Sequence, residues 1–209
     1  MSAESQRLHP RLPHREVTDT DTLRGLAHPL RIQLLDALVE HGPATASELA
    51  TRIGDTQANC SWHLRQLHRY QLVEEAPGGT SRRRPWKLVQ QTLNLDVSGT
   101  GEPTSAAATA ANALSQVLLD RHVAALHQWH IRRRDESDEW REAAHETTTW
   151  GWLTPNELHA FTTELNDVIN RHIVQRLDRI DPQARPSGCR AVRHVSWSIP
   201  GESPAQKRP

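Results

Sequence analysis

The chain has 209 residues, 36% of them apolar, and its 25 Lys and Arg residues balance 25 Asp and Glu residues to a net charge of zero. This length allows one domain of ordinary size and a smaller one, and any nucleic-acid-binding surface would have to concentrate positive charge locally. No apolar run approaches the roughly 18 residues of a membrane span, and two distant cysteines, Cys60 and Cys189, favour a reducing cytoplasm over a disulfide framework.

The first predicted elements are an arm and two helices. Residues 1–18 are polar and contain two prolines, which predicts a disordered arm that lacks the apolar core of a signal peptide. Apolar residues spaced three to four apart then predict a helix that begins near residue 19. Pro29 suits the first turn of a second helix, and Gly42 ends it.

Two further helices follow with a very short connection. Thr45 and Glu48 form a capping box that opens a short helix, and Gly54 stops it. Thr56 then starts a helix that continues to about Gln71. A break of this length between a short helix and the next one is typical of a helix-turn-helix.

A β-hairpin is predicted directly after these helices. Residues 72–76 and 86–90 favour strands, and the turn between them is rich in Gly and Pro. Four helices followed by a hairpin predict a winged helix-turn-helix domain over residues 19–96.

The second half of the chain is predicted to be mainly helical. Residues 97–105 have the composition of a linker, and residues 200–209 that of a disordered tail. Between them, over 106–199, one helical stretch runs to about 147 and an amphipathic helix runs from a capping box at 154–157 to about 180. Residues 147–153 and 195–199 have strand-like patterns that predict a small two-stranded sheet. The predicted fold class is therefore mainly α, a winged helix-turn-helix domain with a β-hairpin wing plus a C-terminal helical region.

The apolar faces of this C-terminal region require a cover. Either they pack against a second subunit, or they enclose a pocket for an unknown small-molecule effector. Tryptophan is common at both kinds of surface, so the tryptophans do not decide between them. We expect dimerisation, and an additional effector pocket in the same region stays an open alternative. Five of the seven tryptophans lie there: Trp129, Trp140, Trp150, Trp152 and Trp197.

The helix from Thr56 has the two faces that a recognition helix needs. Cys60, Leu64 and Leu67 repeat at i, i+4 and i+7 and should be buried. In a major groove, Gln can pair with adenine, Arg with guanine, and Ser with either a base or a phosphate. The opposite face presents Gln57, Ser61, Trp62, Arg65 and Arg69.

The predicted wing adds positive charge beside this helix. Residues 56–87 hold six Lys or Arg against two acids, a local charge of about +4, which suits backbone phosphates. The alternative is an ordinary solvated turn, or a winged helix that binds protein instead of double-stranded DNA. The cations of the wing are Arg82, Arg83, Arg84 and Lys87.

Catalysis is not expected. Cys60 and His63 are spaced as a nucleophile and base could be, but Cys60 lies on the apolar stripe, where a thiol is inert. Serine-hydrolase arrangements, phosphate-binding glycine loops and metal-hydrolase signatures are missing from the sequence.

Residues 19–92 resemble the ArsR-type winged-helix transcriptional repressors of bacteria. The matching motifs are L-A-x-P-x-R-x-x-L-L-x-x-L at 26–38, T-x-x-E-L-A at 45–50, and S-x-H-L-x-x-L at 61–67 followed by LVE. The resemblance implies a cytoplasmic homodimer that binds an imperfect palindrome, represses transcription and in many members responds to a ligand. Gln71 stands where the family usually has a glycine, so we expect the end of this helix to differ.

The resemblance also places the residues that contact DNA. Thr56, Gln57, Ser61 and Trp62 fall where such proteins contact bases or phosphates, and His63 matches a recurrent histidine near that face. Arg65 joins them because of its position on the helix.

Metal sensing, which occurs in this family, has weak support in the sequence. The segment 45–53 contains no cysteine, so the arsenic-type thiol site is absent. Asp120, His122, His127 and His130 match the pieces of a second family site, but the two middle histidines are five positions apart instead of about eleven. Only His127 and His130, three apart, could share one ion on a helix. With 13 histidines in the chain, such pairs arise by chance, so neither metal nor cofactor is expected.

Overall fold

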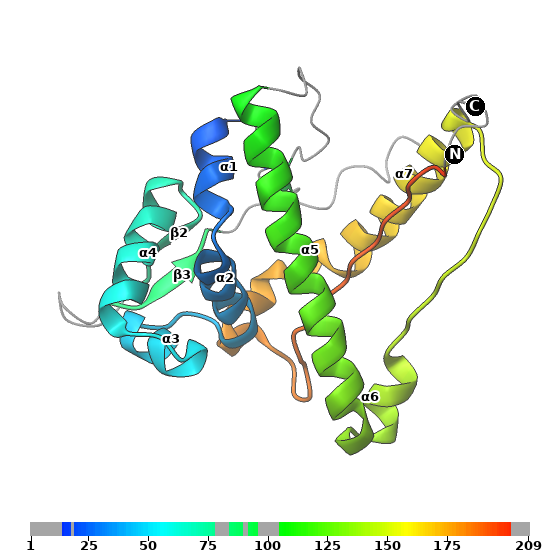
Figure 1. Cartoon of the computed structure of the whole chain (residues 1–209). Helices are drawn as coiled ribbons and strands as arrows, with labels where there is room; N and C mark the ends of the chain where they lie inside the picture. Colours follow the sequence, from blue (N-terminus) through cyan, green and yellow to red (C-terminus); the bar gives the residue numbers. More distant parts are fainter. Residues whose placement is uncertain (1–13, 18, 78–83, 90–91, 96–104, 202–209) are drawn as a thin grey trace, which may run out of the picture.

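A computed structural model describes residues 14–17, 19–77, 84–89, 92–95 and 105–201 (Figure 1). Four helices and a hairpin form the N-terminal domain, and a long helix leads into the second half. The elements of the N-terminal domain are β1 His14–Val17, α1 Thr20–Leu26, α2 Pro29–His41, α3 Ala46–Ile53, α4 Gln57–Arg69, β2 Val73–Glu75, β3 Trp86–Leu88 and β4 Thr92–Leu95. The second half contains α5 Ala106–Arg132, α6 Asp138–Ala143, α7 Pro155–His172 and the 3-10 turns η2 Arg133–Asp135, η3 Val174–Ile180 and η4 Pro182–Ala184.

The hydrophobic core lies between α1–α4, the hairpin and the first turns of α5. Its leucines come from every one of the first four helices, and α5 adds Ala110, Ala111 and Leu114, all at most 2% exposed. In Figure 1, α5 crosses the domain beside α1 and α2 and leaves α4 on the opposite side. The largest side chains of this core are Leu23, Leu26, Leu34, Leu38, Leu49, Leu64 and Leu67.

The helix ends in this domain follow from the residues that cap them. Thr45 and Glu48 form the predicted capping box at the start of α3, and Gly54 ends α3 with a left-handed φ of 79°. Thr56 is the N-cap of α4, and its side chain accepts a hydrogen bond from the backbone N–H of Asn59. These caps fix the short turn that sets α4 against α3.

The C-terminal end of α4 keeps the geometry that a glycine usually supplies. Gln71 adopts a φ of 57°, and among the described residues no other non-glycine residue has a positive φ. The N–H of Gln71 donates to the carbonyl of His68, and the N–H of Leu72 donates to that of Leu67, which is a Schellman motif. The expectation that this end would differ without a glycine is wrong, because the neighbouring hydrogen bonds impose the left-handed conformation.

The predicted wing is present. β2 and β3 pair antiparallel, with Val73 opposite Leu88 and Glu74 opposite Lys87. Trp86 also bridges to Ala44, which ties the hairpin to the start of α3. The tip of the hairpin, residues 78–83, lies outside the described residues.

A second strand pair corrects the expectation for the N-terminal arm. Residues 14–17, which we assigned to a disordered arm, form β1 and pair in parallel with β4. The partner strand lies more than 70 residues further along the chain, and local composition carries no signal for such a pairing. Residues 1–13 lie outside the described part of the chain.

The second half is extended and little buried. From residue 115 to 201, no described side chain is buried. In Figure 1, an extended segment leads from α6 to α7, and α7 stands apart from the N-terminal domain. Ion pairs of Asp36 with Arg121 (2.5 Å) and Arg193 (2.8 Å) attach α5 and the C-terminal segment to α2.

Two expectations for this half are corrected. The helical stretch expected to reach about 147 ends earlier, because α5 stops at Arg132 and only the short α6 follows. Residues 147–153 and 195–199 form no strand, since neither segment finds a backbone partner among the described residues. Among the described helices, none combines the length and the apolar character that crossing a membrane requires.

Candidate nucleic-acid interface

The inward face of α4 is the predicted apolar stripe. Cys60, Leu64 and Leu67 are each 0% exposed and belong to the core cluster. Burial raises the pKa of the Cys60 thiol, and the nearby Asp55 carboxylate raises it further. Cys60 is therefore a structural residue, as the sequence predicted.

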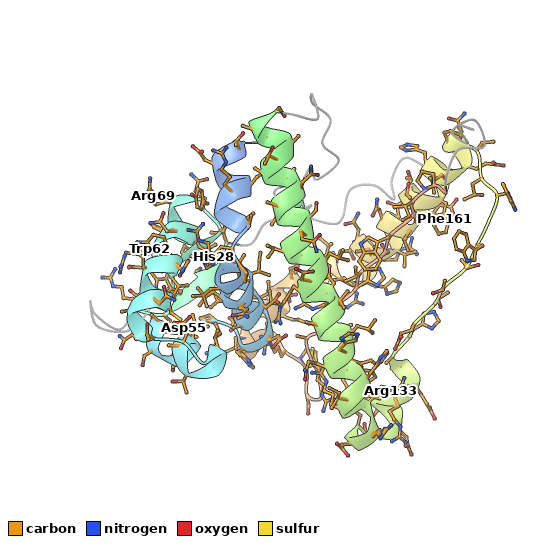
Figure 2. All side chains as sticks on the ribbon, viewed as in Figure 1. His28, Asp55, Trp62, Arg69, Arg133 and Phe161 are labelled. Carbon is orange, nitrogen blue, oxygen red and sulfur yellow. The ribbon has the colours of Figure 1, made fainter. Side chains whose placement is uncertain are left out.

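The outward face of α4 carries the polar side chains proposed to read DNA. Gln57 and Arg65 are exposed, Ser61 is half-buried, and Trp62 leaves 47% of its surface open although its ring is apolar. Figure 2 shows Trp62 and Arg69 on the side of the domain that faces away from α5. The structure thus brings these residues together on one free face of the helix.

Two arginines on this face are held by their neighbours. Arg65 donates a hydrogen bond of 2.8 Å to the Ser61 hydroxyl, and Arg69 donates one of 3.4 Å to the side-chain carbonyl of Gln66. Both arginines remain exposed, so these bonds orient the guanidinium groups without removing them from solvent. A guanidinium held in this way can donate two hydrogen bonds to a guanine edge or to a phosphate.

Asp55 and Asn59 lie at the start of α4, next to the N-cap Thr56, and the sequence patterns did not single them out. Asp55 accepts hydrogen bonds from the Thr56 backbone and from the Asn59 side chain, at 2.5 and 3.1 Å. The Asn59 bond is the main cause that lowers the pKa of the Asp55 carboxyl, and the Thr56 N–H adds to it. The helix dipole stabilises a carboxylate at the start of α4, and such a carboxylate can accept a hydrogen bond from a cytosine amino group. In the sequence, these residues could have been found from the acidic residue that directly precedes the N-cap Thr56.

His63 does not lie on the outward face, which corrects the prediction from the family resemblance. Its side chain is only 4% exposed, and its ring packs 4.4 Å from that of His28. The buried Arg31 on α2 donates from Nε to Nδ1 of His63 at 3.3 Å. The i, i+3 spacing from Cys60 turns His63 toward α2, so it supports the helix from behind and does not reach a base.

The surroundings of His63 keep its ring neutral. Burial is the main cause that lowers its pKa to about 4, and the neighbouring His28 and Arg31 side chains act in the same direction. A neutral ring can accept the Arg31 hydrogen bond, whereas a protonated ring could not.

The described cations of the wing are already paired. Arg84 contacts Glu75 at 2.8 Å, and Lys87 contacts Glu74 at 3.0 Å across the β2–β3 pair. Both pairs are exposed, and surface pairs of this kind contribute about 0–1 kcal/mol, so a phosphate can compete for these cations. Arg82 and Arg83 lie outside the described residues.

The histidines proposed for a metal do not assemble a site. His127 and His130 are exposed on α5, and His130 contacts Glu146 at 2.8 Å. Within the described part of the chain, no three His, Cys, Asp or Glu residues are placed to hold an ion. An open hollow of about 520 Å³ lies nearby, with Trp129, Arg133, Arg134 and Arg141 among its lining residues.

Comparisons with known proteins agree with the geometry of the first half. Residues 26–76 match a family described as "Helix-turn-helix domain", which spans α2, α3, α4 and β2. The chain therefore contains the DNA-binding domain of a helix-turn-helix regulator, followed by a two-stranded wing and a helical region.

Other comparisons add little to this assignment. The search of curated proteins finds no match. Among solved structures, the chain is similar to RV1404 from Mycobacterium tuberculosis, with 15% identity over 72% of this chain and 81% of that one. The TM-score of 0.29 is too low to support a conclusion about fold or function.

Proposed function

We propose that the protein is a sequence-specific transcriptional regulator of the ArsR type, a cytoplasmic repressor that inserts α4 into the major groove of its operator. The observation that carries this proposal is the division of α4 into a buried stripe and an exposed polar face. Gln57, Ser61 and Arg65 contact base edges, while Thr56 and the wing contact phosphates.

The protein acts as a homodimer in this proposal. Leu119, Val123 and Leu126 form a stripe on α5, spaced i, i+4 and i+7 and each 41–43% exposed. Such an apolar stripe on a long helix requires a partner, and a second copy supplies one with the same stripe. Two copies would present two recognition helices to half-sites about one helical turn apart.

A binding experiment tests the DNA-binding role. The full-length protein is incubated with a pool of random duplexes, and the selected duplex is titrated by electrophoretic mobility shift over a range of salt concentrations. We expect affinity to fall as salt rises, because phosphate contacts release counterions, while the preference over scrambled DNA persists. If no duplex is retained at any salt concentration, the chain does not act on DNA and the winged helix serves another partner.

One substitution tests the reading face. Gln57→Ala should cost about 1–3 kcal/mol at one base pair and relax the preference there. Gln128→Ala is the matched control, because Gln128 is also exposed but lies on α5. Unchanged specificity in the Gln57 variant would show that the reading face is assigned wrongly.

A second pair of variants tests the dimer. Val123→Asp places a charge in the α5 stripe and should convert a dimer to a monomer in light scattering at micromolar concentration. Val39→Asp is the control, because Val39 is 43% exposed on α2, outside that stripe. A wild-type monomer at this concentration would contradict the dimer.

A further inference from the structure

We propose that Arg31 is a positioning residue for the reading face: it fixes the Trp62 ring, and Trp62 contacts the methyl group of a thymine in the operator. The inference rests on the proposed DNA-binding function and names one chemical group that α4 recognises. Arg31 is a buried cation on α2, and Trp62 is a partly exposed ring on the outward face of α4.

Arg31 connects three helices, and one of them is the recognition helix α4. Its side chain, on α2, is 9% exposed and donates one hydrogen bond to the Gly25 carbonyl of α1 and another to the His63 ring of α4. The guanidinium carbon lies 5.6 Å from the centre of the Trp62 ring and 6.0 Å from that of Tyr70. Arg31 therefore contacts α4 in its middle and at its C-cap.

The groups that surround the Arg31 guanidinium are unusual for a buried cation. Among the described residues, no carboxylate lies within ion-pair distance of it. A carbonyl, a neutral imidazole and two aromatic faces surround the charge instead, and aromatic faces attract a guanidinium. A buried charge without a counter-ion is costly, so stability alone would favour an apolar residue here. Its directional contacts to α1 and α4 point to a positioning role.

Trp62 is held from two sides. Arg31 lies at its face, and the His63 ring meets it edge-on at 4.7 Å with an interplanar angle of 89°. Nevertheless, 47% of its surface stays exposed, on the same side of the domain as Arg69 (Figure 2). A fixed apolar surface among Gln57, Ser61 and Arg65 suits an apolar group in the major groove, and the thymine 5-methyl is that group.

The position of the Trp62 ring can be measured in the free protein. Full-length protein labelled with 5-fluorotryptophan gives ¹⁹F resonances, and the Trp62 resonance is assigned by its loss in Trp62→Phe. We expect Arg31→Lys and Arg31→Met to shift or broaden it, because neither side chain offers a planar cation. Arg24→Met is the control, since Arg24 is exposed on α1. An unchanged Trp62 resonance in both Arg31 variants would overturn the positioning role.

The thymine contact is measured on the selected duplex by replacing each thymine in turn with deoxyuridine, which removes only the methyl group. We expect one position per half-site where wild-type affinity drops about fourfold, the value for one buried methyl group at about 0.8 kcal/mol. Trp62→Ala should bind both duplexes equally. Arg31→Lys should lose most of the discrimination with an unchanged salt dependence, because Arg31 is buried and meets no phosphate.

The two measurements separate the possible failures. If no deoxyuridine substitution weakens wild-type binding, or if Trp62→Ala keeps the discrimination, the thymine contact is wrong. If Arg31→Lys reduces the salt dependence, Arg31 contacts phosphate directly and is not a positioning residue. If no duplex is selected at all, the DNA-binding function and the thymine contact fail together, and the ¹⁹F spectra still decide whether Arg31 positions Trp62.

Discussion

The N-terminal domain and the second half of the chain use the same kind of amphipathic helix with opposite results. In α4, every apolar position of the stripe is 0% exposed. In α7, Phe161 and Val168 lie on a comparable stripe and remain 50% and 47% exposed. Trp150 and Trp152, just before α7, are almost fully exposed. The difference lies in the partners within reach, because both helices carry the sequence pattern that drives burial.

This comparison shows where the stability of the chain resides. The N-terminal domain has a closed core that α1–α4, the hairpin and the first turns of α5 build together, so these elements can fold as a unit. The second half has apolar faces that nothing in a single described chain covers, and exposed patches of this kind mark interaction sites. In the proposed homodimer, the stability of this half depends on association with the second copy.

The two cysteines give the largest expected contrast between the halves. Cys60 is 0% exposed in the core of the first half, whereas Cys189 is half-buried in the second. With a disulfide reagent under native conditions, Cys189 should react at least about a thousandfold faster, because Cys60 reacts only when a core worth several kcal/mol opens. The raised pKa of the Cys60 thiol slows its reaction further.

Cys60→Ala and Cys189→Ser leave one thiol each and assign the two rates. A Cys189 rate that falls as protein concentration rises would sharpen the comparison, since it would show that association covers this half. Equal reaction rates for both thiols would contradict the difference in burial between the two halves.

Core truncation gives the next largest effect. Leu64→Ala should lower the free energy of unfolding by about 2–5 kcal/mol, because Leu64 is fully buried between α4 and its neighbours. Phe161→Ala is the matched truncation in α7, where half of the ring is already exposed. We expect Phe161→Ala to change the free energy of unfolding of a dilute sample by less than about 1 kcal/mol. Urea unfolding monitored by circular dichroism measures both, and similar losses would contradict the division.

Acid should weaken the first half through His63. Its pKa is about 4 in the folded protein, mainly because the ring is buried, against about 6.5 in an unfolded chain. The unfolded chain therefore binds the proton first as pH falls. The contribution of the neutral His63 ring to the free energy of unfolding should be fully present above about pH 6.5. As pH falls to 4, the free energy of unfolding should drop by up to roughly 3 kcal/mol, at about 1.4 kcal/mol per pH unit.

Urea midpoints measured between pH 4 and pH 8 check this expectation. His63→Gln retains a hydrogen-bond acceptor for Arg31 and should flatten the profile. It should not abolish the slope, because burial also lowers the pKa values of His28 and His122. If His63→Gln showed the wild-type dependence of stability on pH, His63 would not be the cause of the acid sensitivity.

Much of the first half could be predicted from sequence because its signals are local. Thr45 with Glu48, Gly54 and Thr56 lie within the elements that they cap, and the spacing of Cys60, Leu64 and Leu67 fixes one buried face. His63 was misplaced because the contact that buries it comes from Arg31, 32 residues earlier. Periodicity indicates that a face is buried, but the partner comes from the tertiary fold.

The second half could be predicted less well for the same reason. Val195, Trp197 and Ile199 alternate with polar residues as a strand would, yet a strand exists only with a neighbour to pair with. The sequence indicated apolar faces correctly, since Phe161 and Val168 do lie on one side of α7, but it held no signal for what covers them. The pairing of β1 with β4 escaped prediction because it joins distant segments.

The smallest expected effect tests the junction at which α4 meets the wing. Gln71 holds a left-handed φ of 57°, which costs an L-residue about 1–2 kcal/mol and a glycine almost nothing. A glycine also gives the unfolded chain about 0.4–1 kcal/mol of additional conformational entropy to lose on folding. Gln71→Gly should therefore stabilise the domain by less than about 1 kcal/mol in urea unfolding.

Gln71 takes part in a further interaction, so Gln71→Ala is the matched variant. Both substitutions remove the side-chain amide, but alanine retains the backbone strain and glycine releases it. The glycine variant should therefore be more stable than the alanine variant by about 1 kcal/mol, even if both fall below the wild type. Equal stabilities would show that the Schellman hydrogen bonds of Gln71 and Leu72 hold this turn without measurable strain, and that the family's glycine is dispensable for the geometry of α4.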